Sequence, residues 1–274
     1  MWIGSALRRW TWIALGCLVA PARADLSDEI QVYADDINAA GQFHLELHLN
    51  TTPDGRSRPD YGGEITPEHG IRLTPEFSYG LTPDLEAGLY VPAVRASGGS
   101  LYLAGARVRL KWLPIRPDNS AHDSAGYGGA PGRTSGAFAG LNFELSQVAA
   151  RFERDRRVLE IRPMLGWRDP TWLVAFNPVL DVALAGPDHN HPPQFAPALK
   201  IARSVVDWAA LGVEYYVNLG PVTELQPYAR QSHMLFLAAD VDRKPWAFNF
   251  GVGRGFGDDT DRWTVKAIIE VPSD

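Results

Sequence analysis

The sequence predicts an all-β protein, a single antiparallel up-and-down transmembrane β-barrel of about twelve strands. Strand-length stretches alternate strictly between apolar and polar residues, most clearly over residues 43–50. The polar positions carry many ionisable groups, which a soluble sandwich seldom lines up in strands this long. A mature chain of roughly 250 residues, at about 10 residues per strand plus connections, gives the same strand number. We therefore expect apolar side chains to face lipid and polar side chains to face the barrel interior.

The first 24 residues read as a secretory signal peptide. Arg8 and Arg9 precede an apolar run over residues 10–20, and small residues follow up to Ala24, where we expect cleavage. The run is shorter than the roughly 20 residues of a spanning helix, so a retained anchor is the lesser alternative. Cys17, the only cysteine, lies in this leader, and a lipoprotein cleavage there is another alternative.

The rest of the chain, residues 25–274, is expected to be one barrel domain. Nothing in it resembles an interdomain linker, and no later apolar run is long enough for a helical span. The whole chain has 26 basic and 32 acidic residues, a net charge of −6. Loss of three leader arginines leaves 23 basic residues against 32 acidic ones, or −9. Such acidity argues against nucleic acid as a partner.

Turn signals separate the first strands. The strand at 43–50 places Phe43 and the leucines on one face, and a Pro- and Gly-rich loop is expected over 51–69. A strand at 70–81, a tight turn at 82–84, a strand at 85–91 and a turn at 97–100 follow.

The strand at 102–112 is the most informative of the series. Tyr102, Ala104 and Val108 are expected on its lipid face, whereas Arg107, Arg109 and Lys111 share the other face. A basic side chain at the bilayer midplane costs about 2–4 kcal/mol, so these three residues are expected to point inward.

Further strands are expected over seven later stretches: 158–167, 172–184, 195–203, 209–219, 225–238, 246–255 and 263–271. Six tryptophans near strand ends predict aromatic girdles at the membrane interfaces: Trp112, Trp167, Trp172, Trp208, Trp246 and Trp263. Residues 113–135 form a long connection on the side where short turns are expected. Either a further strand lies within residues 31–37, or the 113–135 segment is a long inner-side loop or folds into the barrel as a plug.

The candidate site residues are the charged and imidazole side chains on the predicted inner faces. We expect them to form a network of Arg, Lys and Glu ion pairs, because an unpaired buried charge is costly. The lumen-lining candidates are His44, Glu46, His48, Arg72, Glu76, Glu86, Arg107, Arg109, Lys111, Glu144, Glu160, Arg162, Asp181, Lys200, Glu214 and Lys266.

Two segments carry a family resemblance. The strand-turn-strand sequence YGLTPDLEAGLYVP at residues 79–92 resembles the signature of Gram-negative outer-membrane barrels of the phenol-degradation meta-pathway transporter family. FNFGVGRG at 248–255 followed by WTVKAI at 263–268 is similar to that family's last hairpin. The resemblance implies an outer-membrane protein that admits small, often aromatic or apolar molecules. The chain departs from many outer-membrane barrels in ending Val-Pro-Ser-Asp rather than in an aromatic residue.

No constellation predicts a metal site, a cofactor or catalysis. His44 and His48 share a face with Glu46, but the two histidines lie roughly 13 Å apart along a strand, too far for one ion. The Asp-His-Asn-His stretch at 188–191 and the acidic stretch at 257–261 read as connections. Ser232 and His233 project to opposite strand faces, so His233 would need a distant serine.

The expected function is a narrow outer-membrane channel through which small molecules diffuse past a charged lumen. The expected partners are outer-membrane lipid, small solutes and the barrel-assembly machinery, with the barrel acting as a monomer. An outer-membrane lipid-modifying enzyme, a purely structural or docking barrel and a soluble periplasmic β-protein are the alternatives.

Overall fold

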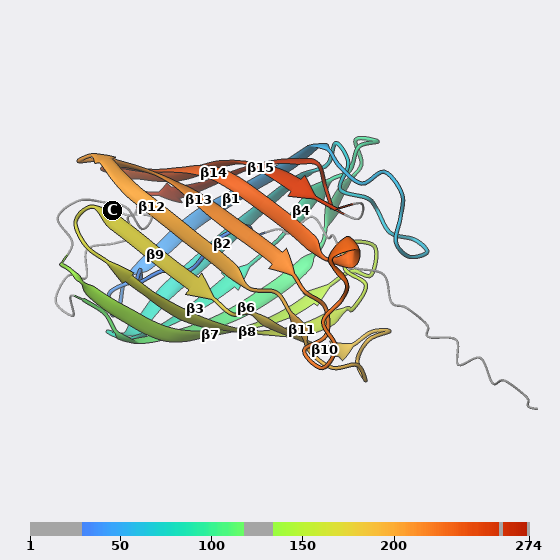
Figure 1. Cartoon of the computed structure of the whole chain (residues 1–274), viewed down its shortest axis with the longest axis horizontal. Coiled ribbons are helices and arrows are strands. Elements are labelled where there is room, and N and C mark those ends of the chain that lie inside the picture. The colour runs from blue at the N-terminus through green and yellow to red at the C-terminus, as the bar shows by residue number, and fades with distance from the viewer. Residues whose placement is uncertain (1–28, 118–133, 258–259, 273–274) are drawn as a thin grey trace, which may run out of the picture.

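The computed structural model describes residues 29–117, 134–257 and 260–272, which form one closed antiparallel barrel (Figure 1). The sheet closes because β1 pairs with β2 on one side and with β16 on the other. The wall has sixteen strand segments but twelve strands, each of which runs from one end of the barrel to the other and is here called a crossing. The difference arises because the segment pairs β3/β4, β5/β6, β9/β10 and β11/β12 are each one interrupted strand. The expected twelve-strand barrel is confirmed. Among the described residues, no helix is long and apolar enough to cross a membrane.

The strand bounds agree closely with the alternation in the sequence. The segments are β1 (Phe43–Asp54), β2 (Ile71–Thr82), β3 (Leu85–Tyr90), β4 (Ala93–Arg95), β5 (Leu101–Leu103), β6 (Gly105–Ile115), β7 (Gly136–Val148), β8 (Arg157–Arg168), β9 (Trp172–Asn177), β10 (Leu180–Ala185), β11 (Gln194–Phe195), β12 (Ala198–Val206), β13 (Ala209–Asn218), the 3-10 helix η1 (Tyr228–Arg230), β14 (Ser232–Arg243), β15 (Trp246–Phe256) and β16 (Trp263–Val271).

The two faces of the wall differ as the alternation predicts. On β6, Val108 is 51% exposed and Leu110 is 42% exposed on the outer surface. Arg109, between them in the sequence, is 6% exposed. A wall that exposes aliphatic side chains and buries charged ones matches the geometry of a membrane barrel and is the reverse of a soluble sandwich.

The two ends of the barrel differ in their connections. At one end, named the turn end (left in Figure 1), short turns at 83–84, 169–171, 207–208 and 244–245 join the strands. Longer connections lie at the opposite end, named the loop end: 55–70, 96–100, 149–156, 186–193, 219–231 and 257–262. Five of the six predicted girdle tryptophans are exposed near the turn end, and Trp263 is exposed near the loop end.

Two strand expectations were wrong. Residues 225–231 are not in a strand; they belong to the connection containing η1, and β14 runs from Ser232 to Arg243. Tyr102 and Ala104 do not face lipid, because the alternation changes phase between Ala104 and Gly105. Both pack inside with Val148 and Phe152 at the loop end. The expected signal peptide, residues 1–24, and most of the 113–135 connection lie outside the described residues.

Substitution of Val108 by arginine is expected to destabilise the barrel by about 2–4 kcal/mol, because the charge would face lipid near the middle of β6. Val222→Arg, in the 219–231 connection, is the matched control and should change stability little. Denaturant unfolding of the two variants in lipid vesicles measures the difference. Equal stability would mean that this face of β6 does not contact lipid.

Candidate functional site

The segment that precedes β1 lies inside the barrel. Residues 29–42, here named the plug segment, contain Val32, Tyr33 and Asn38, each less than 5% exposed. The segment is anchored at the turn end, where the Gly41 amide donates to the Gly80 carbonyl at 2.8 Å. Its other end reaches the loop half, where Glu29 helps to line a cavity. Residues 31–37, the suggested missing strand, form no wall strand.

Tyr33 holds the centre of the plug segment among cations. Its hydroxyl lies 2.8 Å from the Tyr90 hydroxyl, and its backbone exchanges hydrogen bonds with the Asn177 side chain at 2.7 and 3.0 Å. Three cationic groups lie near its ring: the Arg162 guanidinium at 4.4 Å from the centroid, the Lys111 ammonium at 5.1 Å and the Arg109 guanidinium at 5.6 Å. Such contacts are attractive because the ring face is negative.

The barrel wall also supplies hydrogen bonds to the plug backbone. An extended segment without a ladder partner must find other partners for its buried peptide groups. Three basic side chains donate to plug carbonyls: Lys266 to Ile30 at 2.9 Å, Arg162 to Gln31 at 3.1 Å and Lys111 to Asp36 at 3.1 Å. Near the turn end, Arg168 pairs with Asp35 at 2.8 Å. The backbone N–H of Asn38 donates a hydrogen bond to the Glu86 carboxylate at 2.7 Å.

One charge cluster lies on β1, β2, β3, β6 and β16 against the plug segment. Arg109 is its central cation, with its Nη2 atom 2.5 Å from Glu76 Oε1 and 2.6 Å from Glu86 Oε1. His48 Nε2 lies 3.0 Å from Glu76 Oε2. Glu46 stands directly opposite Glu76 on β2, so two carboxyl groups face each other there. Further contacts in this cluster are His44 with Glu270 at 3.2 Å, Lys111 with Glu86 at 3.5 Å and His48 with Glu46 at 3.7 Å.

A second cluster lies on the adjoining part of the wall, on β12 to β16, and shares β16 with the first cluster. Lys200 lies 2.8 Å from Asp240 and 3.3 Å from Glu214. Glu214 also pairs with Lys266 and accepts from the Tyr216 hydroxyl at 2.6 Å. Each of these buried carboxylates therefore has a cationic partner, which offsets the cost of removing it from water.

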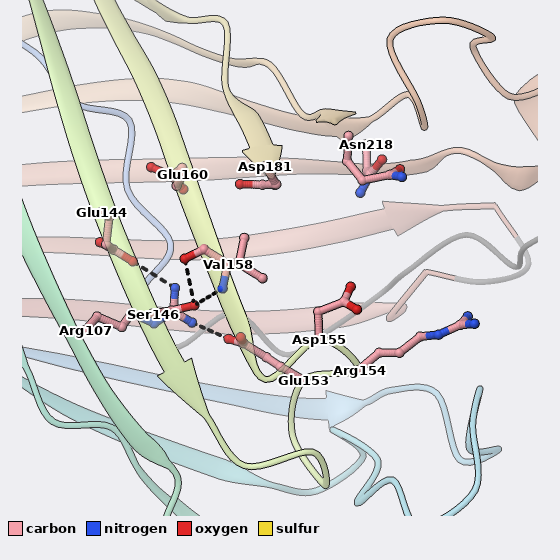
Figure 2. Close-up of a pocket in the computed structure, with 11 residues that line it drawn as sticks. Arg107, Glu144, Ser146, Glu153, Arg154, Asp155, Val158, Glu160, Asp181 and Asn218 are labelled. Atoms are coloured by element: carbon pink, nitrogen blue, oxygen red, sulfur yellow. Dashed lines mark hydrogen bonds and ion pairs between the residues drawn. The ribbon is translucent and has the colours of Figure 1, made fainter. Parts of the chain in front are cut away.

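The third cluster lines a cavity of about 260 Å³ in the loop half, here named the loop-end cavity (Figure 2). Arg107 lies between two carboxylates, 2.9 Å from Glu144 and 2.5 Å from Glu153. Figure 2 shows Glu160 and Asp181, which line the same cavity from the neighbouring strands β8 and β10. Arg162 binds Glu160 through two nitrogens at 2.7 and 2.9 Å.

A second cavity of about 200 Å³ adjoins the first, because Glu160, Asp181 and Asn218 line both. Plug residues Glu29 and Gln31 also line it. The tip of the plug segment therefore borders a polar space in the loop half. A third space, of only about 30 Å³, lies beside Tyr33 and Glu76, so the plug fits closely against this wall.

The structure distributes the sequence-derived site residues over these three clusters, except Arg72. Arg72 is buried on β2, with its guanidinium 5.8 Å from the Phe152 ring centroid. The interior partners that the sequence-derived set left out include Tyr33, Glu153, Arg168, Asn177 and Asp240. Asp240 continues the inward alternation of β14 and would have been found with the correct strand bounds. Tyr33 lies outside the wall, where alternation carries no information.

The residues that could bind a metal ion or act in catalysis already contact other side chains. Glu46, His48 and Glu76 place one ligand atom each within 4.8 Å of one another, the one such metal-like group among the described residues. Arg109 already lies against Glu76 there, so a metal ion would compete with a guanidinium. His233 Nδ1 lies 2.5 Å from the Tyr215 hydroxyl, and its ring is tilted against the Tyr228 ring, with the two centroids 4.7 Å apart.

Comparisons with known proteins identify the fold. No family model matches the sequence, and no curated protein matches it. The COG4313 outer membrane channel from Pseudomonas putida F1 is similar in structure, with a TM-score of 0.55 and 11% identity over 88% of this chain and 99% of that chain. The KdgM porin gives a TM-score of 0.48 at 10% identity, covering 84% and 99%. The likeness to the first protein shows that the chain has the architecture of an outer-membrane barrel.

Proposed function

We propose that the protein is an outer-membrane channel for small molecules and that the plug segment closes it in the conformation described here. The observation that carries the proposal is the character of the interior. A barrel that served only as a scaffold could fill its centre with apolar side chains, whereas this one holds charged side chains, water-sized and larger cavities, and one extended segment. Polar lumens of this kind are typical of channels.

The proposed orientation follows from the two ends of the barrel. Short turns face the periplasm and longer loops face the exterior in bacterial outer-membrane barrels. The turn end, where β1 begins, would therefore face the periplasm, and the loop-end cavity would open toward the outside. The plug segment would enter from the periplasmic side.

The proposed solutes include small aromatic molecules, the class implied by the family resemblance. Tyr33 supports this part of the proposal, because the wall already holds a phenol ring among Arg109, Lys111 and Arg162. A solute ring that replaced Tyr33 would meet the same cations and the Tyr90 hydroxyl.

Tethering the plug segment to the wall is expected to abolish channel openings. Asn38 Nδ2 lies 2.8 Å from Ser78 Oγ, so cysteines at these two positions can be joined by a short reducible bis-methanethiosulfonate linker. The only native cysteine is Cys17, in the expected signal peptide, which limits unwanted coupling. Planar-bilayer recordings should show openings before linking, none after it, and recovery with reductant.

The single variant Asn38→Cys, treated in the same way, is the control and should keep its openings. Openings that persist in the linked double variant would contradict closure by the plug segment. Phospholipid hydrolysis by the purified protein, lost on His233→Ala, would instead assign the lipid-modifying alternative.

A further inference from the structure

The outward face of the barrel wall carries almost only one kind of charged residue. The alternation of exposed and buried positions places five arginines on this face, all of them exposed: Arg95, Arg157, Arg203, Arg243 and Arg254. On the described strands no lysine, glutamate or aspartate shares this face, apart from Asp54 after the irregularity at the end of β1. The wall therefore presents positive charge to its surroundings.

Three of these arginines lie over exposed tryptophans of the predicted girdles. These contacts, here named the Arg–Trp pairs, are Arg203 over Trp172 at 5.6 Å, Arg243 over Trp208 at 5.6 Å and Arg254 over Trp263 at 5.1 Å from the ring centroid. A guanidinium meets an aromatic ring through its flat face, so the N–H groups on its edge stay available. Within the described residues, Arg254 donates to the Arg262 carbonyl, and the side chains of Arg203 and Arg243 donate no hydrogen bond. The pairs thus hold cationic donors at the surface without a carboxylate partner in this part of the chain.

The Arg–Trp pairs lie at two levels of the wall. Arg203 and Arg243 are near the turn end, whereas Arg254 is near the loop end. Arg254 stands opposite Leu235 on β14, and Arg243 follows eight residues later on that strand, which is roughly 27 Å along it. A strand tilt of about 40° reduces this separation to roughly 21 Å along the membrane normal, close to the apolar band of about 25 Å in such barrels. The arginines therefore lie near the two borders of the band, where the lipid headgroups begin.

We propose that the Arg–Trp pairs bind the phosphate groups of anionic membrane lipids. Arginine presents a planar fork that binds two phosphate oxygens through parallel N–H bonds, which the single ammonium of a lysine cannot do. The tryptophan beside it packs against the adjoining part of the same lipid, at the depth where indole rings are favoured. Lipids held at both levels fix the height of the barrel in the bilayer. These sites lie outside the barrel, are complete in the closed protein and need no conduction.

Denaturant unfolding of the protein in phosphatidylglycerol vesicles and in phosphatidylcholine vesicles with the same acyl chains tests the proposal. Choline compensates the phosphate charge in the second lipid, whereas the first lipid leaves that charge unpaired. The measured quantity is the ratio of the folding equilibrium constants in the two lipids. The variant Arg203→Gln/Arg243→Gln/Arg254→Gln should lower this ratio about a hundredfold at low salt, or about fivefold for each arginine beside an anionic surface. The effect should shrink as salt is raised.

The variant Arg58→Gln/Arg156→Gln/Arg230→Gln is the matched control, because it removes three exposed arginines from the loop-end connections. It should lower the ratio less than about threefold, since these residues lie beyond the strands and attraction to the lipid surface falls off within a Debye length.

Equal ratios in the two triple variants would overturn the proposal. So would a loss of stability of the same size in both lipids, because it would assign the Arg–Trp pairs to packing of the wall alone. Cross-linked oligomers that disappear only in the Arg203/Arg243/Arg254 variant would assign these arginines to contacts between copies of the chain instead. Conductance is measured separately, so a silent bilayer would reject the channel and leave this lipid result intact.

Discussion

Removal of residues 29–38 is expected to open the barrel, with a current at least about tenfold larger than that of the full-length protein at the same voltage, because the plug occupies the constriction. The wall should survive the deletion, since its twelve crossings are held by continuous strand pairing that does not involve these residues. The lumen cations that now contact Tyr33 and the plug carbonyls would be hydrated by entering water. Planar-bilayer recording with both proteins measures the change.

Tyr33→Ala is the milder companion to this deletion and should give an intermediate current. It removes the ring among the three cations while Asn38 still holds the segment to Ser78 and Glu86. Heat-modifiable migration on a gel verifies that each variant is folded. A folded deletion variant with the same current as the full-length protein would show that wall side chains close the lumen.

Replacement of Arg109 by leucine is expected to destabilise the barrel by about 3–5 kcal/mol, the usual cost of removing one partner from a buried ion pair. Arg109 is 6% exposed and contacts both Glu76 and Glu86, so its loss leaves two buried carboxylates with less compensation. The double variant Arg109→Leu/Glu86→Gln should recover part of the loss, because one of the stranded charges is then absent.

Denaturant unfolding in detergent micelles, followed by tryptophan fluorescence, compares these variants. Arg254→Leu is the control: Arg254 is exposed on the outer face of β15 over the Trp263 ring, at 5.1 Å, and its loss should cost about 0–1 kcal/mol. If Arg109→Leu and Arg254→Leu lower stability equally, the Arg109 cluster is not held by buried charge pairing.

The wall of the barrel could be predicted from the sequence because its pattern is local. On β1, Phe43 and His48 fall on opposite faces with a period of two residues, and the same spacing places Val108 outside and Arg109 inside on β6. A charged side chain in lipid is costly, so the arrangement with charged residues inward has a much lower free energy than the arrangement with them outward. The prediction failed where the period changes, at Ala104 and Gly105, and where polar residues at 225–231 resembled a strand without pairing as one.

The sequence by itself determined the barrel wall, its approximate strand number and the inward face of the charged side chains that it placed in strands, because contact with lipid or lumen acts on every residue according to its place in a strand. Only the tertiary structure decided which carboxylate meets which cation and what fills the centre. Tyr33 meets Asn177 across 144 positions of sequence, and Lys266 meets Ile30 across 236. Such partners come together only when the cylinder closes around the plug segment, and no spacing along the chain encodes them.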